Sequence, residues 1–184
     1  PFCPPHFQLP SVQQLMEVTK DWDRIFFTTL DVSSYFHSLI PSPLLLKATA
    51  PPWLDQYPFV FVYRDTTWMW MRLPFGWSWS PVIAQEHMLS IVREEISGYN
   101  VIALVYLDDV LVASDDFFAT MEATDACVGN MERSGLVLAE HKCQRSPVET
   151  VEWLGKCIGQ HVVYNSSKRY SQIAAALVQL ATCF

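Results

Sequence analysis

Basic residues are scarce in this sequence of 184 residues, where 12 Lys plus Arg stand against 19 Asp plus Glu and the formal net charge is -7. A module that binds nucleic acid through a basic surface needs the opposite balance, so the charge argues against that class. It is compatible with a site that collects divalent cations among Asp side chains, because the bound ions compensate the negative charge.

Paired cysteines, long apolar runs and an export signal are also lacking. The five cysteines are odd in number and widely spaced, with no C-x-x-C pair and no His placed to complete a zinc site, so we interpret them as reduced thiols. No run reaches the roughly 18 apolar residues of a membrane span. We expect a soluble intracellular protein, cytoplasmic or nuclear, without a membrane partner. The start at Pro1 and the abrupt end at Phe184 suggest a piece of a longer protein.

Apolar residues make up 51% of the sequence, which is enough for the core of one domain spanning 1–184. Their spacing predicts helices at 11–20, 80–97, 117–134 and 167–180. Runs rich in β-branched and aromatic residues predict strands at 24–32, on both sides of a turn at 64–66, and at 101–107, 110–114, 136–142 and 151–159. This order predicts an α+β fold in which helices pack on an antiparallel sheet.

Two adjacent carboxylates, Asp108 and Asp109, separate the apolar runs of "NVIALVYLDDVLVASDD", residues 100–116. A buried carboxylate is costly unless a cation compensates its charge. The alternative is a solvated hairpin turn without a function. If Asp31, which ends another predicted strand, lies beside them, the three carboxylates can hold two Mg²⁺ ions roughly 3.5 to 4 Å apart, as in nucleotidyl transfer.

Four stretches of the chain resemble, in order, motifs of reverse transcriptases. They are "LDVSSYF" (30–36), "LPFGWSWSP" (73–81), "YLDDV" (106–110), and "HKC" with "VEWLG" (141–155). The resemblance implies a polymerase palm with part of the fingers, lacking the basic N-terminal fingers strands and the C-terminal thumb, which would explain the acidic balance. It implies an RNA-directed DNA polymerase of a retroelement, of the DIRS, VIPER or LTR-retrotransposon type.

The same resemblance assigns the metal site. It makes Asp31 and Asp108 direct ligands of two Mg²⁺ ions, for which Mn²⁺ can substitute. Asp109 is then the supporting carboxylate, and the backbone carbonyl of Val32 completes the coordination. Lys142 matches a lysine that assists the departure of pyrophosphate, although a solvated surface lysine is the alternative reading of that residue.

Further residues are implied to contact the nucleotide. Phe36 falls where the family keeps an aromatic ring that blocks a ribose 2′-OH, so the resemblance implies a preference for deoxynucleotides; ordinary core packing is the alternative. Gly76 would let the backbone approach the nucleotide, or simply make a turn. Phe75 stands where retroviral enzymes commonly have Gln.

Tyr106 opens the motif that carries the paired carboxylates. Trp153 and Gly155 fall in the segment that supports the primer 3′ end, although a Trp in a strand is equally suited to a core. The partners implied are an RNA template, a DNA template-primer, dNTPs, and RNase H or other domains of a parent polyprotein. Two other functions are a decayed, non-catalytic palm kept as a scaffold and an unrelated metal-dependent phosphotransferase.

Overall fold

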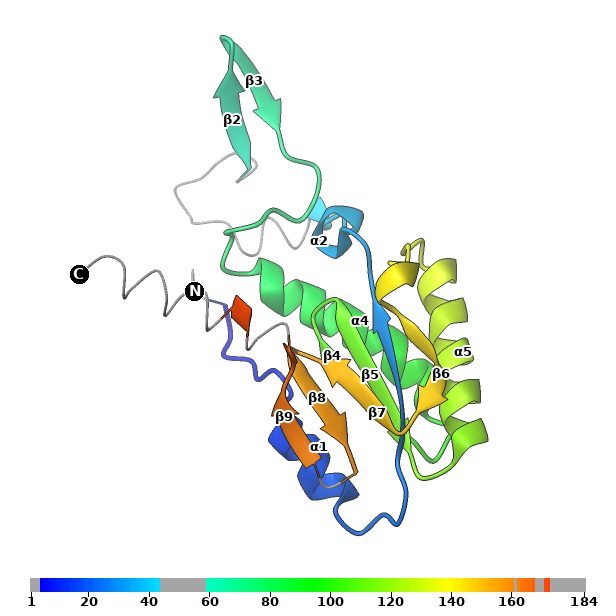
Figure 1. Ribbon diagram of the computed structural model, residues 1–184. Helices are drawn as coiled ribbons and strands as arrows, with labels where there is room; N and C mark the ends of the chain where they lie inside the picture. The colour runs from blue at the N-terminus through cyan, green and yellow to red at the C-terminus, as the bar shows by residue number, and fades with distance from the viewer. Residues whose placement is uncertain (1–3, 44–58, 161, 168–170, 173–184) are drawn as a thin grey trace, which may run out of the picture.

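The computed structural model describes residues 4–43, 59–160, 162–167 and 171–172. Its centre is a four-stranded antiparallel sheet in the order β4-β5-β1-β6 (Figure 1). The strands are β1 (Phe26–Asp31), β4 (Ile102–Tyr106), β5 (Asp109–Ser114) and β6 (Gln144–Val148). The first three coincide with runs of apolar and β-branched residues, which suit a strand covered on both faces.

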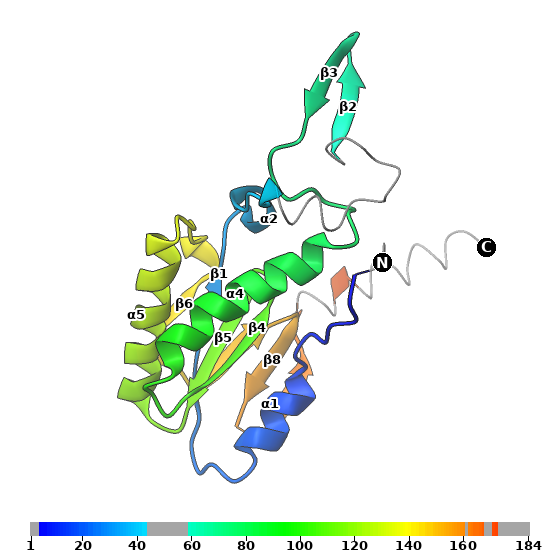
Figure 2. The same ribbon diagram turned by 180° about the vertical axis from the view of Figure 1, so that it is seen from behind.

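Helices α4 (Ser80–Ile96) and α5 (Phe117–Arg133) cover one face of this sheet (Figure 2). Pro81 lies in the first turn of α4, where its missing N–H costs no hydrogen bond. Asp116 caps α5 by accepting a hydrogen bond from the Ala119 N–H at 2.7 Å. The core on this side includes Leu30, Met88, Val110, Val112, Cys127 and Met131. The expected packing of helices on an antiparallel sheet is confirmed.

The opposite face is covered by helix α1 (Val12–Thr19) and a three-stranded sheet in the order β7-β8-β9. Ser11 starts α1 with a capping box, in which the Ser11 hydroxyl and the Gln14 side chain each bind the other's backbone N–H. The small sheet consists of β7 (Thr150–Trp153), β8 (Lys156–Gly159) and β9 (Val162–Asn165). The core on this side includes Leu15, Phe27, Leu111, Ala113, Trp153 and Ile158.

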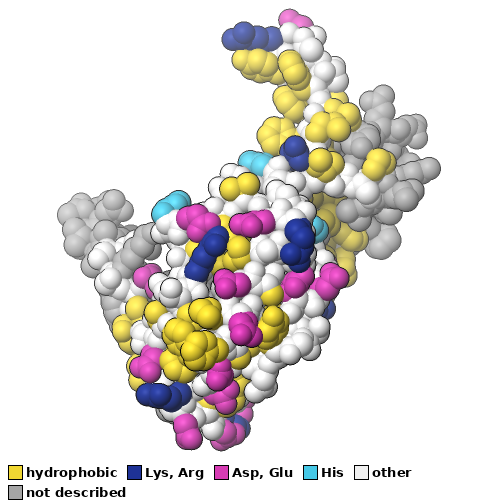
Figure 3. Space-filling view, turned by 90° about the vertical axis from the view of Figure 1, so that its right-hand side faces the viewer, with side chains coloured by type: hydrophobic (Ala, Val, Ile, Leu, Met, Phe, Trp, Pro, Cys, Tyr) yellow, Lys and Arg dark blue, Asp and Glu magenta, His cyan; other side chains and the backbone are white. Residues whose placement is uncertain are grey.

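A separate hairpin of β2 (Val60–Tyr63) and β3 (Thr66–Met69) projects beyond the short helix α2 (Tyr35–Ser38) (Figures 1 and 3). The turn expected at 64–66 is present and consists of Arg64 and Asp65, both with positive φ, while Thr66 begins β3. Every residue of the two strands is exposed. The hairpin therefore contributes nothing to either core.

Residues 136–142 do not form the predicted strand. Val32 and Leu138 make a single antiparallel bridge, and the 3₁₀-helix η1 (Glu140–Lys142) follows. On the side of β1 away from β5, the pairing strand is instead β6, which the sequence did not indicate because it contains Pro147. A proline is tolerated there because β6 is the outer strand of the sheet.

Most of the predicted helix at 167–180, together with Cys3 and Cys183, lies outside the described residues. The other cysteines, Cys127, Cys143 and Cys157, are free thiols, as expected. None of the described helices is both long and apolar enough to cross a membrane.

Candidate functional site

Asp31 and Asp109 face each other at one end of the β1–β5 ladder. Asp31 is the last residue of β1, Asp109 is the first of β5, and the two are paired in register. Directly opposed residues on neighbouring strands have their Cβ atoms about 5 Å apart, and like charges so placed repel. Asp108 immediately precedes Asp109 in the chain. The structure therefore brings together carboxylates from distant parts of the sequence.

The turn before β5 is made by Leu107 and Asp108, so that Asp109 belongs to the strand and not to the turn expected from the sequence. Leu107 has a φ of 57°, in the left-handed region that is unfavourable for a side chain of this kind. The Val32 N–H donates to the Asp108 carbonyl at 3.1 Å. This bond ties the turn to the chain that leaves β1.

The environment raises the pKa of two of the carboxyl groups. Burial, followed by the charges of Asp108 and Asp31, raises the pKa of Asp109 to about 6. Burial is also the main cause that raises the pKa of Asp108, with a smaller contribution from the charge of Asp31. Negative charge is therefore in excess at this end of the sheet.

Lys142 supplies the positive charge that lies against the cluster. It ends η1, and its Nζ is 3.1 Å from both carboxylate oxygens of Asp31. The hydrogen bond and the charge of Asp31 raise the pKa of Lys142. Although its side chain is half-exposed, Lys142 is thus not an isolated surface lysine.

The backbone of Asp31 is held by the same segment that carries Lys142. The Ala139 N–H donates to the Asp31 carbonyl at 2.8 Å, and the Asp31 N–H donates to Cys143 Sγ at 3.4 Å. The 3₁₀ turn thus fixes the main chain of Asp31 as well as contacting its carboxylate. Sequence reasoning missed Cys143, because a single cysteine carries no recognisable signal.

The short helix that follows Asp31 carries the aromatic residues Tyr35 and Phe36. The Phe36 ring is half-buried and packs on Phe75 with 5.0 Å between centroids, while Phe75 remains 69% exposed. Tyr35 is buried, and its hydroxyl donates to the Ala84 carbonyl at 2.8 Å, which anchors α2 to α4. Gly76 has a φ of 84°, so its backbone conformation is one that other residues rarely adopt.

Three other predicted site residues lie near the core between the central sheet, α1 and the small sheet. Trp153 is 3% exposed and packs inside that core, and Tyr106 is partly buried against it. Gly155 has a φ of 69° in the turn between β7 and β8. The structure therefore gives Trp153 the core position that was its alternative reading.

The chemistry of the carboxylate cluster fits a divalent cation. Carboxylate oxygens are the ligands that Mg²⁺ prefers, and an ion among them would relieve the repulsion that raises the pKa of Asp109. Within the described parts of the chain, no three His, Cys, Asp or Glu side chains are arranged to hold one ion. Asp31 instead contacts the Lys142 ammonium.

The raised pKa of Asp109 predicts that the metal-free protein loses stability on going from acid to neutral pH. The pKa of Asp109 rises from its ordinary value of 3.8 to about 6 in the fold, so the folded state holds an extra proton between these values and the free energy of unfolding falls as pH rises through them. Thermal melts in chelator from about pH 4 to about pH 7.5 should show this fall, and Asp109→Asn should flatten it.

Asp125→Asn is the matched control for these melts, because Asp125 is an exposed carboxylate on α5. It should leave the pH profile unchanged. A profile for Asp109→Asn that runs parallel to that of the unchanged protein would contradict the prediction.

Comparison with known proteins places this chain in a family. Residues 1–158 match the family described as "Reverse transcriptase (RNA-dependent DNA polymerase)". The chain is 28% identical over 130 residues to a retrovirus-related Pol polyprotein from transposon opus of Drosophila melanogaster, covering 71% of the chain and 12% of that protein. It is 24% identical over 167 residues to the enzymatic polyprotein of Figwort mosaic virus, covering 87% of the chain and 22% of that protein. The chain thus spans less than a quarter of either relative.

Solved structures show the same fold. The foamy viral protease-reverse transcriptase in complex with dsDNA matches 92% of this chain with a TM-score of 0.65 at 18% identity, over 32% of its own length. The same type of protein in complex with an RNA/DNA hybrid matches 81% of this chain with a TM-score of 0.63, over 18% of its own length. The fold is therefore like that of a polymerase palm. Since the family match covers most of its length, this chain belongs to the reverse transcriptase (RNA-dependent DNA polymerase) family.

Proposed function

We propose that this chain is the palm, with part of the fingers, of an RNA-directed DNA polymerase from a retroelement. Its reaction is the template-directed addition of dNTPs to a primer 3′-OH. The observation that carries the proposal is the pairing of Asp31 with Asp109 beside the turn of Asp108, with Lys142 on Asp31. Membership of the reverse transcriptase family supports it.

The proposed partners are an RNA template, a DNA template-primer and dNTPs. RNase H or other domains of a parent polyprotein are further partners, because the relatives from transposon opus and Figwort mosaic virus are polyproteins. The solved relatives hold dsDNA or an RNA/DNA hybrid, which are the products and templates of such a reaction.

The carboxylates have distinct tasks in this proposal. Asp31 and Asp108 hold two Mg²⁺ ions, with Asp109 in support and the Val32 carbonyl completing the ligands. Bound there, the ions supply positive charge to the attacking and leaving oxygens of phosphoryl transfer. The β1–β5 ladder contributes rigidity, because residues on paired strands are held more closely than residues on a loop.

Lys142 serves as the proton donor to the leaving pyrophosphate. A lysine ammonium carries its proton at neutral pH, and the Nζ of Lys142 already lies at the carboxylate cluster. A positioned acid next to the leaving group is the requirement of general acid catalysis. Trp153 and Gly155 act more remotely in this proposal, by fixing the strand turn that supports the primer. Tyr106 acts from its position opposite Asp109 in the β4–β5 ladder.

Phe36 and Phe75 form the wall beside the sugar. Their rings are packed together, so Phe36 is held in place on one side by Phe75. A ring fixed next to the 2′ carbon excludes a hydroxyl by steric clash, which gives selectivity without any new attraction. Gly76 follows Phe75 and, lacking a side chain, lets the backbone approach the nucleotide before the chain turns toward α4.

Primer extension tests the proposed reaction directly. On RNA and DNA templates with dNTPs and Mg²⁺, the protein should extend a primer, and Asp108→Asn should reduce the rate by about a thousandfold or more because a metal ligand is lost. Asp125→Asn should retain the rate. Since the relatives are several times longer, the assay should use both this chain and the longest natural protein that contains it. Absence of extension by both would favour the non-catalytic scaffold.

Metal binding is tested independently by thermal unfolding. At neutral pH, Mg²⁺ or Mn²⁺ at about ten times its dissociation constant should stabilise the fold by about 1.4 kcal/mol and raise Tm by about 3 to 5 °C. Asp108→Asn should abolish that shift while leaving the metal-free protein at least as stable, because one repelling charge is gone. An equal shift in the variant would refute the assigned site.

Replacing Phe36 tests the selection of the sugar. Phe36→Val or Phe36→Ala should lower discrimination against rNTPs by roughly tenfold or more, while dNTP incorporation changes much less. Phe118→Ala, at an exposed ring on α5, is the matched control and should change neither. Unchanged rejection of rNTPs by an active Phe36 variant would show that this ring is only a core residue.

A further inference from the structure

A buried glutamine on α4 lies behind the turn that carries Asp108. Gln85 is only 3% exposed and lies on the apolar side of the helix, between Val82 and Met88. A primary amide in a core is costly unless its N–H and C=O groups both find partners. Gln85 therefore needs a specific pair of hydrogen bonds, and a polar residue in this apolar pattern is the signal that sequence reasoning missed.

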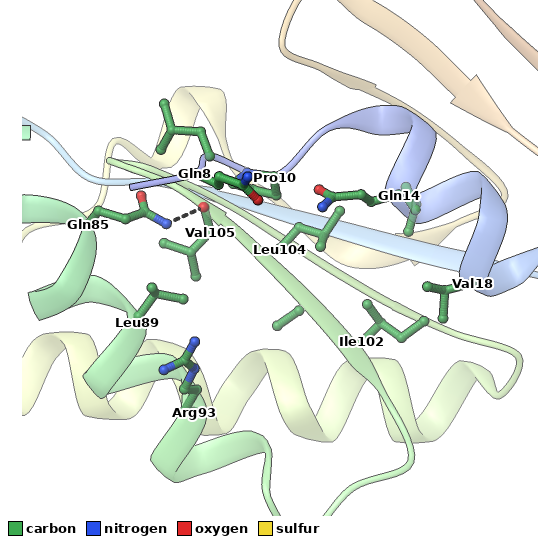
Figure 4. Close-up of a pocket in the computed structure, with 13 residues that line it drawn as sticks. Gln8, Pro10, Gln14, Val18, Gln85, Leu89, Arg93, Ile102, Leu104 and Val105 are labelled. Carbon is green, nitrogen blue, oxygen red and sulfur yellow. Dashed lines mark hydrogen bonds between the residues drawn. The ribbon is translucent and has the colours of Figure 1, made fainter. Parts of the chain in front are cut away.

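Both partners of Gln85 are backbone groups that flank the turn. Its Nε2 donates to the Val105 carbonyl at 2.7 Å, and its Oε1 accepts from the Leu107 N–H at 2.8 Å. Figure 4 shows Gln85 reaching Val105 from α4 at the end of a groove of about 460 Å³. The side chain thus bridges Val105 in β4 and Leu107 in the turn, just before Asp108.

These bonds replace those of a neighbouring strand. β4 is the outer strand of the central sheet, with β5 on its inner side. Gln85 uses one amide N–H as donor and its carbonyl oxygen as acceptor, as the N–H and C=O of one residue in an added strand would. Gln85 thus supplies hydrogen-bond partners to the backbone at the end of the outer edge of β4.

The contact acts on a residue in an unfavourable conformation. Leu107 has a φ of 57°, which a non-glycine residue keeps only where its surroundings fix it. The Leu107 N–H is fixed by Gln85, and the Asp108 carbonyl accepts from the Val32 N–H at 3.1 Å. The turn is therefore held on one side by α4 and on the other by the chain after β1.

We propose that Gln85 is a positioning residue that keeps the turn of Leu107 and Asp108 in the conformation required for metal binding and nucleotide addition. This inference rests on the function proposed above. Gln85 touches neither substrate nor metal in this role and acts only through the backbone of the turn. The role predicts a loss of metal affinity that exceeds what the loss of stability alone would cause.

Gln85→Leu tests the role by removing both hydrogen bonds at similar volume. The Leu107 amide should exchange with solvent about tenfold faster relative to the Val112 amide, and Mn²⁺ affinity should fall about tenfold, as expected for a lost hydrogen bond to the turn. In primer extension, kcat should fall with little change in the KM for dNTP. Amide exchange and Mn²⁺ titration report on the turn without requiring polymerisation.

Asn130→Leu is the matched control, because the Asn130 amide makes one bond between α5 and α4, to the Ile91 carbonyl at 3.1 Å. It should lower Tm without changing Mn²⁺ affinity or the Leu107 amide. Gln85→Glu is the second variant. It keeps an acceptor for the Leu107 N–H, so protection of that amide should stay closer to that of the unchanged protein than in Gln85→Leu.

The outcomes separate the two proposals. If the unchanged protein binds Mn²⁺ and Gln85→Leu binds it equally well, the positioning role is refuted while the metal site stands. The same holds if Gln85→Leu and Asn130→Leu behave alike, or if Gln85→Glu and Gln85→Leu expose the Leu107 amide equally. If the unchanged protein binds no Mn²⁺, the proposed function fails, and the positioning role that rests on it fails too.

Discussion

Repulsion between carboxylates at the end of the β1–β5 ladder is the constraint on which the rest of the site depends. Strand pairing opposes Asp31 to Asp109, and the turn adds Asp108. Such an arrangement is unfavourable in itself, so neighbouring groups must hold it together. Lys142 compensates charge, while bonds from Ala139 and Val32 fix the main chain around the cluster. The cluster therefore lowers the free energy of unfolding at neutral pH.

The two cores explain how this unfavourable site is kept in place. One core packs α4 and α5 on the sheet, and the other packs α1 and the β7–β8 hairpin on its reverse. With both faces covered, β1 and β5 cannot slip in register without exposing buried side chains. The apolar packing thus fixes the opposition of the carboxylates, although none of these carboxylates belongs to either core.

Sequence alone predicted the strands and helices that have strong periodicity. It also predicted that Asp31 would lie beside the paired carboxylates, and the structure opposes Asp31 to Asp109. It failed at 136–142, where apolar residues form a bridge and a 3₁₀ turn, and at β6, where Pro147 hid an outer strand. These errors share a cause, because local patterns do not report which segment pairs with an edge. The contacts of Gln85 and Cys143 depend on tertiary placement, and no local pattern reveals them.

The hairpin of β2 and β3 has a consequence of a different kind. All of its strand residues are exposed, and a two-stranded hairpin alone is only marginally stable in water. Its opening therefore costs little and leaves both cores intact, so the molecule has at least two tiers of local stability. Among the described residues, β2 and β3 pair only with each other, and their outer edges and exposed side chains, among them Phe61, Trp68 and Met69, are features that favour self-association.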